Sequence, residues 1–75
     1  MPRGQQQEHV PIPINGVKHE TPRAVLIEYF DADAGKFRNI WIPRSQLFEG
    51  DDVHVDPEVK KLNISPWFCD KEGLE

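Results

Sequence analysis

The sequence feature that most constrains the fold is a pair of β-forming runs separated by a turn. Arg23–Phe30 is rich in Val, Leu, Ile, Tyr and Phe, which fit a pleated and half-buried surface, and Phe37–Ile42 has the same character. The residues between them read Asp-Ala-Asp-Ala-Gly, where Asp favours the start of a turn and Gly35 can take a positive φ. The pattern predicts an antiparallel hairpin with strands at about 23–30 and 36–42.

The length of the turn predicts the register of this hairpin. A four-residue loop ending at Gly35 pairs Asp31 with Lys36 and sets the ladder behind them. One face then becomes the expected core face, with Val25 opposite Ile42, Ile27 opposite Ile40 and Tyr29 opposite Arg38. The other face has Leu26 opposite Trp41, Glu28 opposite Asn39 and Phe30 opposite Phe37. A slip of one residue would exchange the faces, and turn chemistry alone does not exclude it.

A sheet that is apolar on both sides must be covered twice or must present an aromatic patch to a partner. Three aromatic side chains of the second face, with two cations at its rim, are therefore the candidate binding residues. They are Phe30, Lys36, Phe37, Trp41 and Arg44.

Length, charge and cysteine content exclude several classes of function. A chain of 75 residues forms one domain and leaves little room for a substrate cavity. The net charge of −4 argues against a protein that holds nucleic acid mainly by neutralising phosphates. The single cysteine, Cys69, excludes an intrachain disulfide and a cysteine-based zinc site, and suits a reducing cytoplasm. No run is long enough to span a bilayer and no signal peptide is evident, so we expect a soluble, cytoplasmic protein.

The segments around the hairpin complete a single β-rich domain over residues 10–75, preceded by a disordered tail over residues 1–9. Val10–Ile14 alternates apolar residues with prolines, which predicts an edge strand or an extended polyproline-like segment. A second short hairpin is expected near 52–64. The alternative for this region is a short helix that is capped by Asp56 and runs to Leu62.

Capping residues predict a short helix at the end of the chain. Ser65 is the expected N-cap, Pro66 the first helical residue and Gly73 the C-terminal stop. Two helical turns are not stable alone in water, so Trp67 and Phe68 should dock on the aromatic face of the hairpin. The predicted fold class is α+β, mainly antiparallel β: a small curved sheet or open barrel with a short C-terminal helix.

Two short motifs carry a resemblance to known sequences. The first is Trp-Ile-Pro-Arg-Ser-Gln over 41–46, and the second comprises Trp67, Phe68, Lys71, Gly73 and Leu74. In these motifs the chain resembles a group of short, uncharacterised phage and bacterial proteins. In that group a strand ends in W-[IL]-P-[KR]-S-Q and a later helix carries W-[LF]-x-x-K-x-G-L. The chain differs from the pattern in a longer hairpin loop, a longer acidic stretch and Pro66, and the resemblance implies no activity.

Residues with catalytic or metal-binding chemistry are sparse. Asp52, His54 and Asp56 alternate, so on a strand they would share one face and offer ligands to a divalent metal. The solvent face of an edge strand gives the same alternation, and we favour that interpretation because no further ligand is identifiable. Ser45 lacks the glycines of a nucleophile elbow, and Cys69 fits as a small apolar filler. We therefore predict no enzyme activity, no metal site and no cofactor.

Two binding hypotheses remain for the five candidate residues. In the first, the rings and cations form a stacking platform for single-stranded nucleic acid. In the second, the helix covers the rings, and the protein binds a protein partner or itself, as a weak homodimer, through a strand edge. The acidic balance and the need to dock Trp67 favour the second. The sequence thus predicts a non-catalytic accessory or interaction protein, with single-stranded nucleic-acid binding as the alternative.

Overall fold

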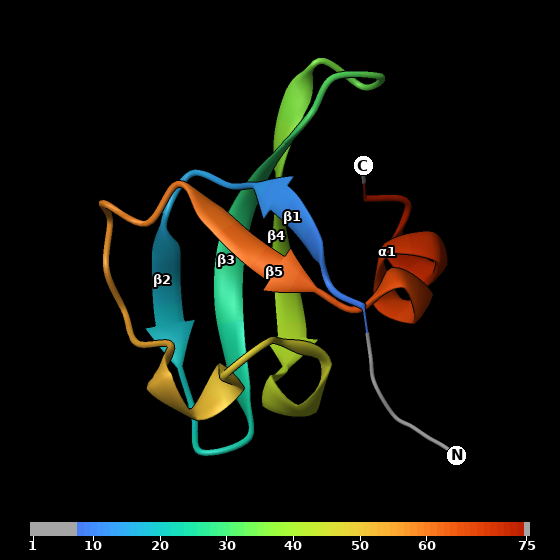
Figure 1. Cartoon of the computed structure of the whole chain (residues 1–75). Coiled ribbons are helices and arrows are strands. Elements are labelled where there is room, and N and C mark those ends of the chain that lie inside the picture. Colours follow the sequence, from blue (N-terminus) through green and yellow to red (C-terminus); the bar gives the residue numbers. More distant parts are fainter. Residues whose placement is uncertain (1–7, 75) are drawn as a thin grey trace.

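The computed structural model describes residues 8–74, and these form two small antiparallel sheets and one short helix. The three-stranded sheet has the order β2-β3-β4, and the second sheet pairs β1 with β5 (Figure 1). The strands are β1 (Val10–Pro13), β2 (Val17–Glu20), β3 (Ala24–Asp31), β4 (Lys36–Pro43) and β5 (Lys61–Ile64). The helices are the 3-10 helices η1 (Arg44–Gln46) and η2 (Gly50–Asp52) and the α-helix α1 (Pro66–Glu72). The predicted α+β class, mainly antiparallel, is confirmed, and the sheets do not close into a barrel.

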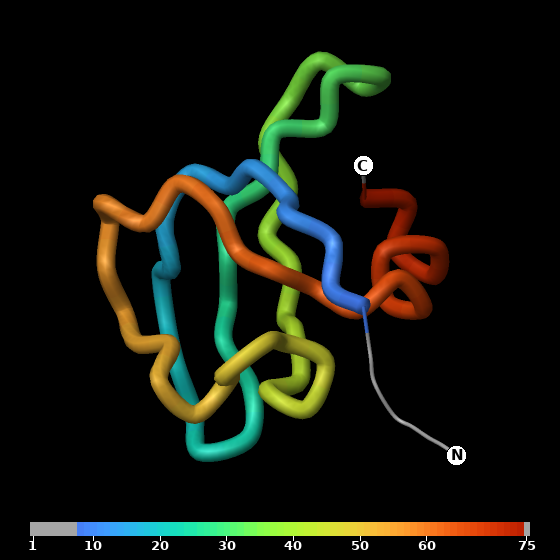
Figure 2. The backbone as a smooth tube through the Cα atoms, viewed as in Figure 1, coloured from blue at the N-terminus to red at the C-terminus, as the bar shows by residue number. Residues whose placement is uncertain are grey.

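The β3–β4 hairpin has the predicted register. Asp31 pairs with Lys36, and the ladder continues without a shift to Ala24 opposite Pro43. In the turn, the Asp31 side chain accepts hydrogen bonds from the backbone N–H groups of Asp33 and Ala34 at 3.1 and 3.2 Å. Gly35 has φ 71° and donates to the Asp31 carbonyl at 2.7 Å. The tip of this hairpin projects beyond the second sheet (Figure 2).

The predicted second hairpin over 52–64 is wrong. The only part of it that forms a strand is β5, and its partner is β1, with Val10 opposite Ile64 and Pro13 opposite Lys61. The segment after η2 instead runs beside β2, where Asp56 exchanges two backbone hydrogen bonds of 3.0 Å with Val17. The alternative helix is also absent from this described segment, and Asp56 begins a turn instead. Because β1 and β5 lie far apart in the sequence, local alternation gave no indication of their pairing.

The N-terminal segment is an edge strand, as its prolines predict. β1 pairs on one side only, with β5, so Pro11 and Pro13 are tolerated there. The predicted tail over 1–9 lies largely outside the described residues. Its last two residues are described, and one of them, His9, makes an edge-on contact with Phe48 at 5.6 Å between ring centroids.

The hydrophobic core lies between the two sheets, because β1 and β5 cross one face of the three-stranded sheet (Figure 1). The face of the hairpin that was predicted to be the core face is buried there. Its members Val25, Ile27, Ile40 and Ile42 are at most 5% exposed. From the second sheet, Ile12 and Ile64 are fully buried against them. Alternation along each strand therefore leaves the other face of β2-β3-β4 toward solvent.

The helix α1 has the predicted caps but not the predicted docking site. The Ser65 hydroxyl accepts from Phe68 N–H at 3.2 Å, and Gly73 ends the helix with φ 73°. Phe68 is 3% exposed in the core, on the side opposite to the aromatic face, whereas Trp67 is 62% exposed. Consecutive helical residues point about 100° apart, so Trp67 and Phe68 cannot enter the same receptor. Helix α1 follows β5 directly and lies on the β4 side of the molecule in Figure 1, where Arg38 donates to the Glu72 carbonyl at 3.2 Å.

Candidate functional site

The solvent face of the three-stranded sheet carries the aromatic side chains that the sequence singled out. Phe30, Phe37 and Trp41 are about half exposed, at 49%, 52% and 49%. We call these three residues the aromatic face. The prediction that α1 covers them is wrong, because that helix packs on the core side through Phe68. The sheet therefore presents three half-exposed aromatic side chains to solvent.

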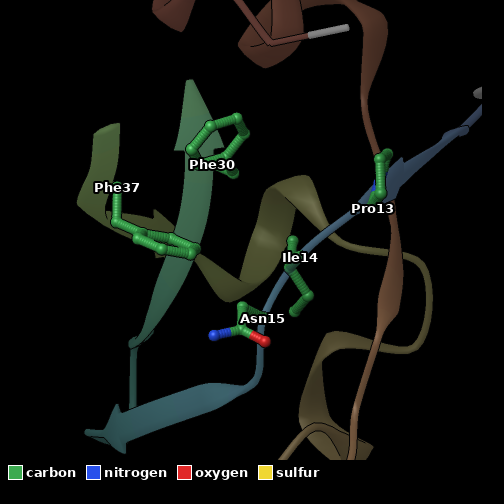
Figure 3. A pocket seen from close by; sticks show the side chains of 5 residues that line it. All are labelled: Pro13, Ile14, Asn15, Phe30 and Phe37. Carbon is green, nitrogen blue, oxygen red and sulfur yellow. The ribbon is translucent and has the colours of Figure 1, made fainter. Parts of the chain in front are cut away.

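Two of the three rings form the wall of a pocket at the hairpin tip. The centroids of Phe30 and Phe37 are 5.2 Å apart, with the rings edge to face at 67°. Together with the end of β1 and the link from β1 to β2 they line an open pocket of about 350 Å³ (Figure 3). The end of β1 contributes Pro13, and the link contributes Ile14 and Asn15. None of these three was a candidate in the sequence, because their proximity to the hairpin depends on how β1 crosses the sheet.

The side-chain amide of Asn15, the polar group in this pocket, is already hydrogen-bonded within the protein. The Asn15 backbone N–H donates to the Glu28 carbonyl at 2.7 Å, and its side-chain amide donates to the Glu28 carboxylate at 2.8 Å. Lys60 approaches the Asn15 side-chain oxygen at 3.4 Å. The pocket thus offers an apolar wall with one fixed amide. Trp41 lies four residues from Phe37 along β4, opposite Leu26. Within residues 8–74, no ring contact joins Trp41 to the Phe pair.

The edge of β4 is open along the same residues that carry the rings. On β3, the backbone groups of Ala24 and Glu28 bond toward the β2 side, so by alternation the even-numbered residues of β3 face β2 and the odd-numbered residues bond to β4. Their partners on β4 are the even-numbered residues, and the odd-numbered ones must point their N–H and C=O groups away from β3. These are Phe37, Asn39 and Trp41. Among residues 8–74, no segment beyond β4 accepts or donates a backbone hydrogen bond to them.

Arg44, one of the two candidate binding cations, is a structural residue. Its side chain is only 10% exposed and joins three segments. The guanidinium donates to the backbone carbonyls of Thr21, Gly50 and Val53 at 3.0, 2.7 and 2.6 Å, and to Glu20 Oε1 at 3.0 Å. Four of the five N–H groups of the guanidinium are therefore directed at the protein itself. The prediction that Arg44 serves a ligand is not supported by this geometry.

Lys36, the other candidate cation, is exposed but lies on the wrong side for a stacking platform. It pairs with Asp31 at the end of β4, and its side chain alternates with that of Phe37, so it points to the opposite face. On the aromatic side, Lys18 is paired with Glu28 at 3.6 Å. The charges near the rings are therefore balanced rather than basic.

The acidic and histidine residues after η1 do not form the predicted strand. Asp52 is in η2, and the His54 ring Nδ1 lies 3.0 Å from Glu20 Oε1. The hydrogen bond with His54 lowers the pKa of Glu20, and the Val55 backbone N–H, 3.3 Å from Oε2, acts in the same direction. In the described part of the chain, no three His, Cys, Asp or Glu side chains come together as metal ligands.

The single cysteine is part of the core. Cys69 is 6% exposed, and burial raises the pKa of its thiol. A buried thiol with a raised pKa is a poor nucleophile, which agrees with its expected role as an apolar filler.

No protein-family model, curated protein or solved structure matches the chain. The motif resemblance to phage and bacterial proteins therefore stays a prediction. Over residues 8–74, no helix has the length and apolar character that crossing a membrane requires.

Proposed function

We propose that this chain is a non-catalytic interaction protein that binds a protein partner along the edge of β4. The observation that carries the proposal is the coincidence of two features on Phe37, Asn39 and Trp41. Their backbone groups point away from the sheet, and two of their side chains are half-exposed aromatic rings. A strand that adds to such an edge gains main-chain hydrogen bonds for affinity and ring contacts for specificity.

The distribution of charge supports a protein partner over single-stranded nucleic acid. A stacking platform needs cations beside its rings to follow the phosphate backbone. Here Arg44 is occupied by the protein itself, Lys36 points to the other face, and Lys18 is neutralised by Glu28. The net charge of −4 adds a general repulsion from nucleic acid.

The remaining parts of the proposal follow from the sequence. An accessory role in a bacterium or its phage rests on the two tryptophan-containing motifs. A cytoplasmic location rests on the single cysteine, because a chain with no disulfide suits a reducing compartment. The absence of catalysis is proposed because the buried Cys69 and the exposed Ser45 have no general base assigned to them in the described residues.

Panning a random peptide library against the protein tests the proposal. We expect selected peptides to alternate aromatic or β-branched residues with polar ones, as an added strand requires. Asn39→Pro removes the central outward N–H of the edge and should abolish peptide binding, whereas the matched variant Asn39→Ala retains that N–H and should bind. Equal binding by both variants would contradict the edge-strand mode.

An oligonucleotide titration tests the alternative function. In the Trp67→Phe background, Trp41 is the sole tryptophan and reports directly on the aromatic face. We expect no quenching of its fluorescence by oligothymidine at low salt. Saturable quenching that is lost at high salt would support nucleic-acid binding instead.

A further inference from the structure

We propose that the strand that adds to β4 is β4 of a second copy of this chain, related by a two-fold axis at Asn39. This inference rests on the proposed function and names its partner. It predicts a six-stranded sheet across the dimer, with α1 of each copy beside the contact, where Arg38 of β4 donates to the Glu72 carbonyl at 3.2 Å.

The positions of the outward backbone groups make this edge self-complementary. An antiparallel pair must place outward residues opposite outward residues, and the outward set is Phe37, Asn39 and Trp41. With the axis at Asn39, this residue faces its own copy, and Phe37 faces Trp41 of the second copy on both sides of the axis. All three outward residues of each chain are used, which gives about six inter-chain backbone hydrogen bonds.

The side chains select the same register. Phe37 and the second copy's Trp41 then lie directly opposite on the solvent face, and aromatic cross-strand pairs are among the stabilising ones. On the other face, Arg38 lies opposite Ile40, so no charge faces a like charge. An axis at Arg38 would instead place Trp41 opposite Gly35 of the second copy, beyond the end of β4, and would leave the Trp41 ring without an aromatic partner across the contact.

Pro43 excludes the remaining shift. With the axis at Ile40, Pro43 would lie opposite Phe37 inside the ladder, where it cannot donate a hydrogen bond. With the axis at Asn39, Pro43 lies opposite Gly35 of the second copy, beyond the end of the paired segment. The proline therefore ends the inter-chain ladder where the aromatic residues end.

The exposed area predicts a weak dimer. Phe37 and Trp41 have about half of their surface still exposed, and complete burial of such rings removes roughly 150–250 Å² each. Four rings in the dimer thus supply about 400 Å², and the paired backbones add to this. The total falls at the low end of specific interfaces, near 1,200 Å² or less, where association is transient. We expect dissociation on dilution into the low micromolar range, about 10 μM.

Sedimentation of the full chain over a concentration series up to about 1 mM tests the inference. We expect the weight-average mass to rise toward twice the monomer mass, and Trp41→Ala to weaken association at least tenfold. The matched control is Trp67→Ala, which removes the most exposed aromatic ring from α1 and should leave association unchanged. Equal effects of the two variants would overturn the inference.

Asn39→Cys tests the register. An axis through this residue brings the two Cα atoms to about 5.5 Å, within disulfide range, so mild oxidation should link the two copies. Asn63→Cys, an exposed position on β5, should not link, and Cys69 is buried and does not compete. Equal linking by both variants would show random collision and overturn the register.

Different results would overturn the homodimer and the more general proposal that β4 binds a protein partner. A chain that stays monomeric at about 1 mM but binds selected peptides through β4 would overturn the dimer and leave the interaction function standing. A monomer that also binds no peptide would overturn both. Saturable oligonucleotide quenching of Trp41 would replace both with the nucleic-acid function.

Discussion

Truncation of Arg44 to alanine is the change with the largest expected effect on stability among the candidate residues. The side chain is 10% exposed and donates to three backbone carbonyls, those of Thr21, Gly50 and Val53, at 2.6 to 3.0 Å. These carbonyls belong to the β2–β3 link and to the segment around η2. Without the guanidinium, the segment after η1 loses its polar attachment to the end of β4, although Asp56 still exchanges two backbone hydrogen bonds with Val17 of β2.

The expected cost can be worked out from these contacts. A hydrogen bond to a charged group contributes about 1.5–3 kcal/mol, which gives a gross value of roughly 5–9 kcal/mol for three. Water replaces part of this, because the accepting carbonyls lie near the surface, so we expect a net loss of about 3 kcal/mol. A domain of this length has a free energy of unfolding of about 4–11 kcal/mol. Arg44→Ala should therefore lower the melting temperature by about 12–24 °C.

Urea denaturation followed by far-UV circular dichroism measures this loss. The matched control is Arg23→Ala, which removes an exposed arginine next to the same turn and should change stability by less than about 0.5 kcal/mol. Arg44→Lys should be intermediate, because one ammonium group cannot reach all of the carbonyls at once. If Arg44→Ala costs less than about 1 kcal/mol, the residue does not hold these segments together, and a ligand-binding role for its charge would be open again.

Three further changes test local features of the fold. Ser65→Ala removes the N-cap of α1 and should cost about 1–2 kcal/mol in urea denaturation, whereas the exposed Ser45→Ala should be nearly neutral; equal costs would contradict the cap. Gly50→Ala places its new Cβ against a backbone carbonyl of η1 and should prevent stable folding, whereas Gly35→Ala meets no atom and should cost only about 1–2 kcal/mol for its positive φ, as thermal melts would show. The pKa of Glu20 is lowered from its ordinary 4.5, so its stabilising effect is present above that pH and is lost as the pH falls through the lower folded value. At neutral pH, the melting temperature of Glu20→Gln should therefore be lower than that of the unchanged chain. An equal difference at acid pH would refute the pairing of Glu20 with His54.

The sequence by itself determined the local elements of this protein. Four residues between Asp31 and Lys36, with glycine at the last of them, predicted the hairpin register that the structure has, because loop length and positive φ are local properties of the chain. The register in turn predicted which side chains share a face of the sheet, including the aliphatic residues of the core face. Ser65, Pro66 and Gly73 likewise predicted both ends of α1, because capping satisfies backbone groups within one helical turn.

Only the tertiary structure decided which of these elements meet. The pairing of β5 with β1 joins segments that are distant in sequence, and the alternation over 52–56 resembled a strand although that segment only bridges to β2. The sequence alone suggested that Arg44 is a surface cation, whereas in the structure three carbonyls from two separate segments accept hydrogen bonds from it. The position of α1 after β5 decides which of its two aromatic residues is buried. Phe68 lies in the core, Trp67 is exposed, and neither covers the aromatic face. Long-range contacts depend on the closure of the whole chain, and local residue patterns carry no information about that closure.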